Sequence, residues 1–554
     1  MNHFNLLRPT DSANSLKSYG FASGFPRNLL RPTRKQYSDE LRSREFPRIH
    51  SASRPQYLAN SLKSYGFASG FPRRSRVRKV SFETGLAFPS FIRRTRKSTP
   101  FARVMYQGFT ESVVPHKNGM KICGHIISRK NGWVVATVHG NATERGYAHG
   151  ALLHSELKRV LECFPFLVKT DFHTTFDEYI QRCKTKIRPI LERDYREYFD
   201  ELSGICLGAK SKGLDISVDI LIGWNSCLSM YEEYDSMPEP QRCSAFIATG
   251  NATAKGDIVM AHNTHCNFVL GSLSNIVLYV DPSDGHSFCM QTCPGMICSS
   301  MDWFICSNGM VGCETTISGI KYKPVFGAPY YCRIRDCMQY RNSLDEYATT
   351  MLHKNAGDYA GSWLFGDTRT GEIMLCEIGL KTHHIEKTRN GVFYGMNSVM
   401  DPIMRLGETT DTSAGDISQS SGARRARFEY LLTDKYAGKI TASNAKLVLA
   451  DHYDVLLNRN HLGLRCICKH SELSNENAKR TPFYPHGAID GKVVNTEMAR
   501  KMAFVGKFGA SCNRAFRAKS YLKKHPEYAD WRDYLVNLPN RPWTEIQFTT
   551  ASPP

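Results

Sequence analysis

The sequence lacks the hydrophobic segments that direct proteins into or across membranes. No run of about 18 apolar residues occurs, so the sequence predicts no transmembrane helix. The N-terminus, MNHFNLLRPTDSANSLKSYG, also lacks the apolar stretch of a secretory signal. The N-terminal segment that it opens is rich in Arg and Ser and poor in acids, as organelle transit peptides are, but we favour a cytoplasmic location over that alternative.

The sequence also lacks a CxxC pair and any regular framework of cysteine spacings. All 18 cysteines follow residue 104. This distribution is typical of reduced thiols and argues against a small disulfide-stabilised domain.

The segment most similar to a metal site is CICKH, which contains Cys466, Cys468 and His470. His262 and His265 of the HNTH segment are candidates to complete it. Neither set has the spacing of a zinc finger, so the sequence predicts no metal and no cofactor.

Acidic residues are scarce in the first 104 residues. This segment contains 21 of the 72 Lys and Arg but only 5 of the 52 Asp and Glu, so it carries +16 of the net charge of +20. It is rich in Arg, Ser, Pro and Gly without a sustained apolar period, and we expect it to be disordered. Nucleic-acid binding is therefore an expectation for residues 1–104 alone.

The basic segment contains an internal repeat. ANSLKSYGFASGFPR at residues 13–27 recurs letter for letter at 59–73, which indicates recent duplication of coding DNA. Three interpretations of the segment are open. It is an RNA- or phosphate-binding arm, it is a nonfunctional extension, or translation normally begins at Met105 and residues 1–104 are read through from upstream sequence. We hypothesise the third.

Residues 105–242 are predicted to be rich in helix. Apolar residues recur at i, i+3 and i+4 over 144–164 and 176–213, after a strand-like WVVATVHG. SMPEPQR at 236–242 then supplies two prolines and polar residues, as expected of a linker. We treat 105–242 as an N-terminal segment and 243–554 as the second part of the folded body.

The second part begins with a predicted β-hairpin. CSAFIAT at 243–249 and DIVMAH at 257–262 are short apolar runs, and the turn-forming GNATAKG separates them. Cys243 then lies at the start of the first strand, and His262 to His265 lie at the end of the second, opposite it. Further strand-like runs follow up to residue 398, with helices near 330–355, 423–434 and 496–505. The pattern predicts an α+β fold of layered antiparallel sheets and helices, for which a four-layer αββα sandwich is suitable.

A cysteine at the start of a strand can act as a catalytic N-terminal residue. Once its α-amino group is released, that amine lies beside the thiol and titrates near pH ~8. Cys243 would then supply both nucleophile and general base. The alternative is a buried structural cysteine, one of 18.

Several segments together resemble a known family. The segments that carry the resemblance are CSAF with AHNTH, CPGMICSSMDWFICSNGMVGCETTI (293–317), RGYAHGALLHSEL (145–157), SGARRARFEYLL (421–432) and GAIDGKVVNTEMARKMAFVGKFGASC (487–512). The set resembles the C45 acyltransferase and peptidase family of Ntn hydrolases, including phospholipase B-like and penicillin acyltransferase-like proteins. This resemblance implies an αββα Ntn fold that is made as a precursor and cuts itself before the nucleophilic cysteine.

The resemblance also implies roles for individual residues, with cleavage between Arg242 and Cys243. The implied catalytic residues are Cys243 as nucleophile, Asn397 as oxyanion donor, His262 and Arg424, although Arg425 and Arg427 are close enough to compete with Arg424. The implied pocket residues are Asn263, Thr264, His265, Thr315 and Thr316. A strand-end histidine, a turn-stabilising asparagine and a surface ion-pairing arginine are the alternatives for His262, Asn397 and Arg424.

The chain departs from its relatives at two of these positions. Arg242 stands where penicillin acyltransferase-like members have Gly, which makes self-cleavage less secure than the nucleophile. His265 stands where phospholipase B-like relatives carry Trp, and those relatives are secreted or lysosomal. A lipid substrate therefore does not follow from the resemblance.

Three functions remain open from the sequence. The first is an amidohydrolase or acyltransferase acting on a small or lipid-like acyl substrate, with the N-terminal segment and the second part associated after cleavage. The second is phospholipase B-like hydrolysis of lipid acyl esters. The third is a non-catalytic nucleic-acid-binding protein with a basic tail on a hydrolase scaffold.

Overall fold

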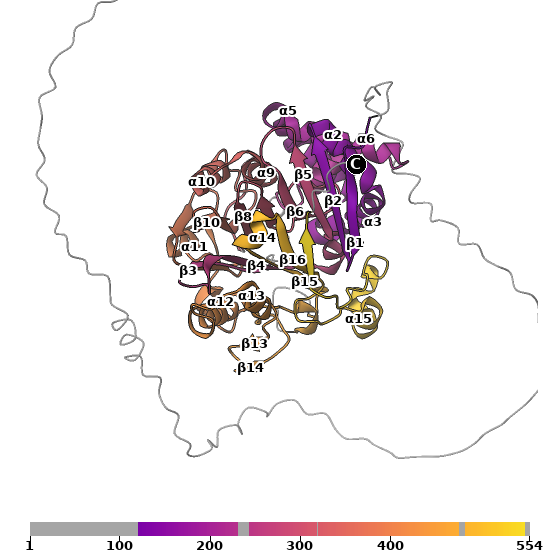
Figure 1. Ribbon diagram of the computed structural model, residues 1–554. Helices are drawn as coiled ribbons and strands as arrows, with labels where there is room; N and C mark the ends of the chain where they lie inside the picture. The colour runs from indigo at the N-terminus through magenta and orange to yellow at the C-terminus, as the bar shows by residue number, and fades with distance from the viewer. Residues whose placement is uncertain (1–119, 231–242, 318, 476–481, 549–554) are drawn as a thin grey trace, which may run out of the picture. The chain divides into compact units, whose positions relative to one another are not determined.

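The computed structural model describes residues 120–230, 243–317, 319–475 and 482–548 (Figure 1). All of these residues belong to one compact unit, Thr99–Pro554. The basic segment 1–104 and the linker 236–242, including Arg242, lie outside the described residues. No helix in the described ranges combines the length and apolar character needed to cross a membrane.

The body is a mixed α/β structure with two large sheets. The larger sheet has nine strands, and its strand order is β1-β2-β5-β6-β7-β8-β9-β10-β11. Its strands are β1 (Gly124–Lys130), β2 (Trp133–Gly140), β5 (Ile276–Pro282), β6 (Phe288–Thr292), β7 (Trp303–Cys306), β8 (Met310–Thr316), β9 (Gly361–Asp367), β10 (Glu372–Ile378) and β11 (His383–Thr388).

The antiparallel prediction is wrong for one pair of strands in this sheet. β2 and β5 are parallel, because a long excursion through helices and the hairpin separates them in sequence. The N-terminal segment thus contributes two strands, β1 and β2, to the sheet of the second part.

The second sheet has six strands in the order β12-β3-β4-β15-β16-β17. They are β12 (Gly391–Gly395), β3 (Ser244–Gly250), β4 (Gly256–Asn267), β15 (His486–Asn495), β16 (Ala503–Phe508) and β17 (Thr544–Gln547). The predicted hairpin is confirmed as the antiparallel pair β3 and β4. The predicted end of its second strand is wrong, because pairing with β15 extends β4 through the HNTH segment to Asn267.

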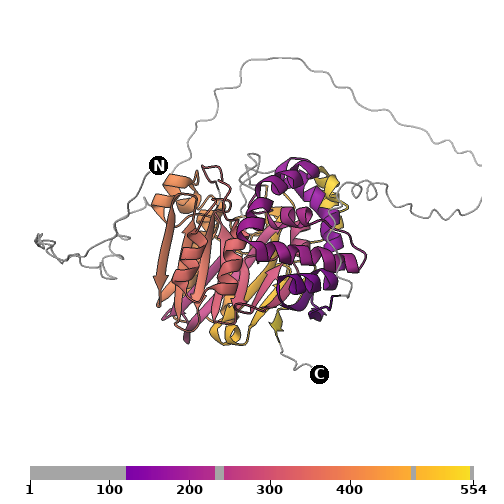
Figure 2. The same cartoon turned by 90° about the horizontal axis from the view of Figure 1, so that it is seen from above.

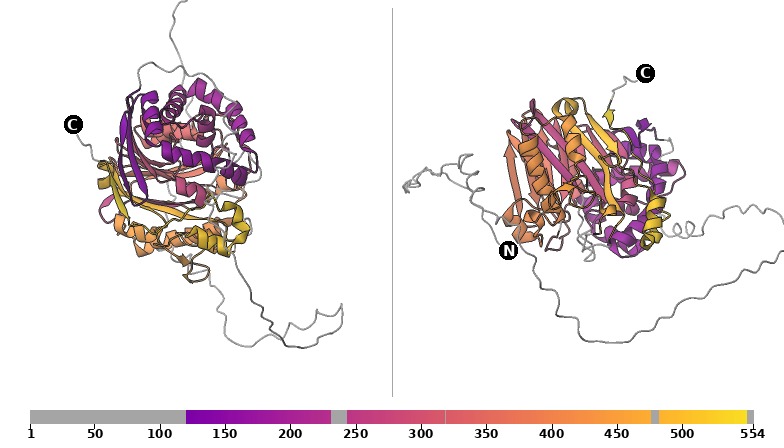
Figure 3. Two further views of the ribbon diagram at one scale, coloured as in Figure 1. Left: turned by 90° about the vertical axis from the view of Figure 1, so that its right-hand side faces the viewer. Right: turned by 90° about the horizontal axis from the view of Figure 1, so that it is seen from below.

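The alternating side chains of β3 show how the two sheets are arranged. Ala245 and Ile247 belong to the core shared with the nine-stranded sheet, whereas Phe246 and Ala248 belong to a second core with α12 and α13. Figure 3 shows α12 (Ser420–Tyr430) and α13 (Ala442–Leu449), in orange, on the side of the sheets opposite the indigo N-terminal helices.

Helices also cover the outer face of the nine-stranded sheet (Figure 2). The contacts come from α2 (Ala142–Leu152) on β1 and β2, α9 (Tyr330–Tyr340) on β7, and α10 (Leu344–Leu352) on β9 and β10. The start of β3 is therefore buried between packed layers.

The remaining N-terminal helices pack on α2 and on one another. They are α3 (His154–Phe172), α4 (Phe176–Lys186), α5 (Arg188–Asp194), α6 (Arg196–Ser211) and α7 (Val218–Asn225). The helix-period segment 176–213 forms three helices, because Pro189 is the second residue of α5 and Tyr195 leaves helical geometry at φ −134°.

Shorter elements complete the described body. They are α8 (Phe268–Leu273), α11 (Pro402–Glu408), α14 (Thr496–Arg500), α15 (Ala518–Lys524) and a small hairpin of β13 (Tyr453–Asp454) and β14 (Arg459–Asn460). The helix predicted at 496–505 ends at Arg500, since Ala503 already pairs with β17.

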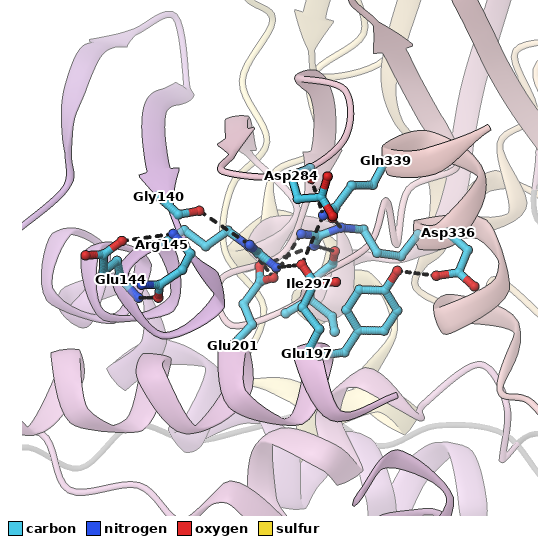
Figure 4. Close-up of polar contacts among 12 residues, drawn as sticks. Gly140, Glu144, Arg145, Glu197, Glu201, Asp284, Ile297, Asp336 and Gln339 are labelled. Carbon is cyan, nitrogen blue, oxygen red and sulfur yellow. Dashed lines mark hydrogen bonds and ion pairs between the residues drawn. The ribbon is translucent and has the colours of Figure 1, made fainter. Parts of the chain in front are cut away.

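A buried ionic network joins the N-terminal segment to the second part (Figure 4). Arg145 of α2 pairs with Glu197 and Glu201 of α6 at 2.7 and 2.6 Å, and Arg335 of α9 pairs with Glu201 at 2.9 Å. Burial alone would raise the pKa of Glu201, but the two guanidinium groups hold it below its usual value. Removing either arginine would leave Glu201 without one of its two buried counterions.

Candidate active site

Cys243 lies directly before β3 and is 2% exposed. Burial, followed by the nearby carboxyl groups of Asp302 and Glu314, raises the pKa of its thiol. Glu314 lies on β8 of the nine-stranded sheet, so the thiol is directed between the two sheets. The thiol is therefore shielded from solvent, and its surroundings favour the protonated form.

Arg424 of α12 connects Cys243 to Asn397. Its Nη1 donates to the Cys243 carbonyl oxygen at 2.7 Å and to Ser244 Oγ at 3.0 Å. Its Nη2 donates to the Met396 carbonyl oxygen at 2.7 Å and to Asn397 Oδ1 at 2.9 Å. Burial lowers the pKa of Arg424 to about 10, which leaves the group charged at neutral pH. One guanidinium group thus orients the start of β3 and the end of β12.

The neighbouring arginines have other partners. Arg425 Nη1 donates to the Ala414 carbonyl oxygen at 3.4 Å, and Arg427 forms an ion pair with Asp451 at 2.7 Å. Arg427 therefore forms the kind of ion pair that was the alternative role for Arg424, whereas Arg424 itself is fully buried.

Asn397 lies two residues beyond β12 in the left-handed region, with φ of 76°. Arg424 binds its Oδ1, and its Nδ2 donates to the Thr316 carbonyl oxygen at 2.9 Å. A primary amide has two N–H bonds, so Asn397 has a second N–H group besides the one that binds the Thr316 carbonyl oxygen.

Thr315 and Thr316 lie on β8 beside Asn397. Thr315 packs against Gly395, where an added Cβ would lie 2.2 Å from Thr315 Oγ1. Thr316 Oγ1 shares a hydrogen bond with the Tyr359 hydroxyl at 2.6 Å. The C-terminal ends of β8 and β12 thus lie near the start of β3, which directly follows Cys243.

The HNTH residues divide between the two faces of β4. His262 Nε2 lies 2.9 Å from the Glu314 carbonyl oxygen, and Thr264 Oγ1 accepts from Lys492, so both face the nine-stranded sheet. Asn263 Nδ2 donates to the Leu449 carbonyl oxygen of α13 at 2.8 Å. Alternation along the strand therefore separates Asn263 from the thiol of Cys243.

Both histidines of this segment are buried and neutral. Burial, with smaller contributions from nearby cations, holds the pKa of His262 and of His265 well below the usual value. Nδ1 of His262 and both ring nitrogens of His265 form no hydrogen bond with the described residues.

A buried Lys492–Asp490 pair near Cys243 was not among the predicted site residues. The two charged groups are 2.9 Å apart on β15, both with 0% side-chain exposure. Lys492 also donates to Thr264 Oγ1 at 2.7 Å, and it opposes the rise in the pKa of Cys243. The i, i+2 spacing in AIDGKVV could have indicated this pair, since two opposite charges lie on one face of an apolar strand.

The described residues include one group with metal-ligand chemistry, formed by His452, Cys468, His470 and Cys512. Two of its members come from the CICKH segment. Cys466 is outside the group, and its thiol instead contacts the Gly463 carbonyl oxygen at 3.4 Å. His262 and His265 are not members either.

No protein-family model matches the chain. A protein of unknown function from Archaeoglobus fulgidus is 22% identical over 269 residues, which are 45% of this chain and 44% of that protein. The match thus spans less than half of that relative.

Two solved structures of conjugated bile acid hydrolase from Clostridium perfringens show limited similarity. One, a cysteine-to-alanine mutant, aligns with a TM-score of 0.28 and 10% identity over 48% of this chain and 89% of its own. The other, an arginine-to-leucine variant, aligns with a TM-score of 0.25 and 10% identity over 56% of this chain and 90% of its own. Similarity at these scores does not identify the function of this chain.

Proposed function

We propose that the protein is an Ntn-type hydrolase or acyltransferase with Cys243 as nucleophile, acting on acyl-amide bonds. The observation that carries the proposal is the Arg424 guanidinium group, which binds the Cys243 carbonyl oxygen and the Asn397 side chain at once. A nucleophile and an oxyanion donor need such a fixed mutual geometry. The stacked sheets and covering helices also suit the αββα fold of the family that the sequence resembles.

The first reaction is self-cleavage before Cys243. The Cys243 thiol adds to the Arg242 carbonyl carbon, the Arg242–Cys243 C–N bond breaks, and a thioester forms while the amine takes up a proton. Water then cleaves the thioester, leaving a carboxylate on Arg242 and a free α-amino group and thiol on Cys243. Cleavage of the full sequence gives chains of 242 and 312 residues, and a translation start at Met105 shortens the first chain to 138 residues.

Turnover follows from the free amino terminus. The α-amine accepts the thiol proton, and the thiolate adds to the substrate carbonyl carbon. The remaining N–H of Asn397 stabilises the oxyanion, the amine leaves with a proton, and water or another acceptor removes the acyl group from sulfur. Arg424, His262 and Lys492 act as positioning residues around the reacting groups.

Contacts across the cleavage point support continued association of the two chains. β2 pairs with β5 along seven residue pairs, and the buried Glu201 binds Arg335 of the second part. Breaking this interface would expose a sheet edge and leave a buried charge uncompensated.

Substrate assays with purified protein test the proposal and separate it from its alternatives. The protein should release fatty acid from N-acyl amides, and Cys243→Ala should abolish this release while Cys289→Ala retains it. Release from phospholipid esters alone would favour the phospholipase B-like alternative. Salt-dependent RNA binding that requires residues 1–104, with no hydrolysis, would favour the nucleic-acid alternative.

A further inference from the structure

The loop after α13 and the segment after β16 bring two thiols and two imidazoles together. His452, Cys468 and His470 come from the loop, and Cys512 follows β16 by four residues. One side-chain nitrogen or sulfur atom from each residue lies within 4.8 Å of all the others. Segments distant in sequence thus converge on one point, although no zinc-finger spacing connects them.

This donor set matches the chemistry of zinc. Two thiolates and two imidazoles form a common tetrahedral zinc site, in which neighbouring ligand atoms are about 3.3 to 3.8 Å apart. His470 Nε2 and Cys512 Sγ are already 3.4 Å apart. Ca²⁺ and Mg²⁺ prefer oxygen ligands, which these four side chains lack.

The surroundings of both imidazoles also fit a metal site. His470 Nδ1 lies 3.0 Å from Glu472 Oε1, which orients the ring and directs Nε2 toward the thiols. A carboxylate bound to the second nitrogen of a metal-ligating histidine is a common outer-shell arrangement. The His452 ring packs 5.4 Å from that of His470, and its Nε2 is buried without a hydrogen bond to the described residues.

An open cleft gives access to the group. A cavity of about 690 Å³ is lined by His452 and Cys512 together with His461 and five other residues. An ion could therefore reach the ligands without unfolding the body, as a metal site requires.

We propose that His452, Cys468, His470 and Cys512 bind one Zn²⁺ ion in a tetrahedral structural site. Four protein ligands leave no open coordination position, so the ion fixes the loop and takes no part in the reaction.

Other residues of the same loop contact the start of β3 and the nearby end of β4. The carbonyl oxygen of Ile467 accepts a hydrogen bond from Ser244 Oγ at 3.0 Å, and Lys469 is fully buried close to His265. Zinc bound through Cys468 and His470 therefore supports the loop that packs beside Cys243. This consequence for catalysis rests on the proposed function, whereas zinc binding does not.

Metal analysis of the purified full-length protein tests the proposal directly. We expect about one zinc per chain by inductively coupled plasma mass spectrometry, and thiolate-to-cobalt charge-transfer bands after exchange with Co²⁺. The C468S/C512S double variant should lose both signals. Cys466→Ser is the matched control, because this neighbouring buried thiol lies outside the group and its variant should retain zinc.

A milder variant guards against loss of the fold. Glu472→Gln should keep the zinc ligands and weaken zinc affinity by about 10- to 100-fold in a chelator competition. Wild-type protein without zinc that also fails to bind added Zn²⁺ would overturn the proposal. So would a Cys468–Cys512 disulfide in freshly isolated protein, or full zinc content in C468S/C512S, whatever the hydrolase assays show.

Discussion

Arg424 donates a hydrogen bond of 2.7 Å to the carbonyl oxygen of Cys243. The donor is a fully buried cation, and the acceptor belongs to the residue before β3. Charge-assisted hydrogen bonds are short and directional, so this contact fixes the backbone that carries the thiol. The geometry of the proposed reaction therefore depends on an arginine 181 residues away in sequence.

Arg424→Lys should lower turnover by about 10²-fold or more. Lysine keeps the charge but cannot bind two backbone carbonyl groups and the Asn397 side chain with a planar fork. Initial rates on an N-acyl amide would measure the loss. Arg427→Lys serves as the control, because Arg427 pairs with Asp451 away from Cys243, and equal rates for both variants would contradict the assignment.

Asn397→Gly should lower turnover by on the order of 10² to 10³-fold, as loss of an oxyanion donor does. Glycine tolerates the φ of 76° at this position, so the variant removes the amide without straining the backbone. Asn131→Gly, at φ 52° in a distant turn, is the matched control. Unchanged kcat in Asn397→Gly would remove this residue from the mechanism.

Lys492→Met should destabilise the protein by about 3 to 5 kcal/mol, because Asp490 would remain buried without its counterion. Urea unfolding followed by tryptophan fluorescence gives the free energy. The K492M/D490L double variant should recover most of this loss. A double variant no more stable than K492M would show that the two charges do not act as a pair.

Acidification should destabilise the fold partly through His149. Its Nε2 accepts a hydrogen bond of 2.9 Å from the Gly295 amide, and burial lowers its pKa to about 4. The unfolded chain binds this proton near pH 6.5, so between pH 6.5 and 4 stability falls as pH falls, by about 2 kcal/mol at pH 5. His149→Gln should remove about 2 kcal/mol from the fall in unfolding free energy between pH 6.5 and pH 5. An unchanged fall would show that His149 does not cause this pH dependence.

The sequence predicted the hairpin of β3 and β4 because its two short apolar runs and the turn residues between them are local signals. The contacts of Arg424 could not be predicted from such signals, since α12 meets β3 only through tertiary packing. β15 was not predicted, because Asp490 and Lys492 interrupt the apolar run that indicates a buried strand, and only their i, i+2 spacing is a local signal of a charged pair on one face.

The candidate metal group shows this limit most clearly. CICKH supplied Cys468 and His470, but their partners His452 and Cys512 lie 16 residues before and 44 residues after Cys468. Spacing rules describe compact zinc motifs and do not detect ligands from separate segments.

Mass analysis of protein quenched with acid during turnover of an N-acyl amide detects both the cut before Cys243 and the acyl intermediate. We expect a 312-residue chain that begins at Cys243 and carries the acyl group on that thiol. Full activity from an uncut chain, with no acyl adduct on Cys243, would contradict the role of Cys243 as an N-terminal nucleophile.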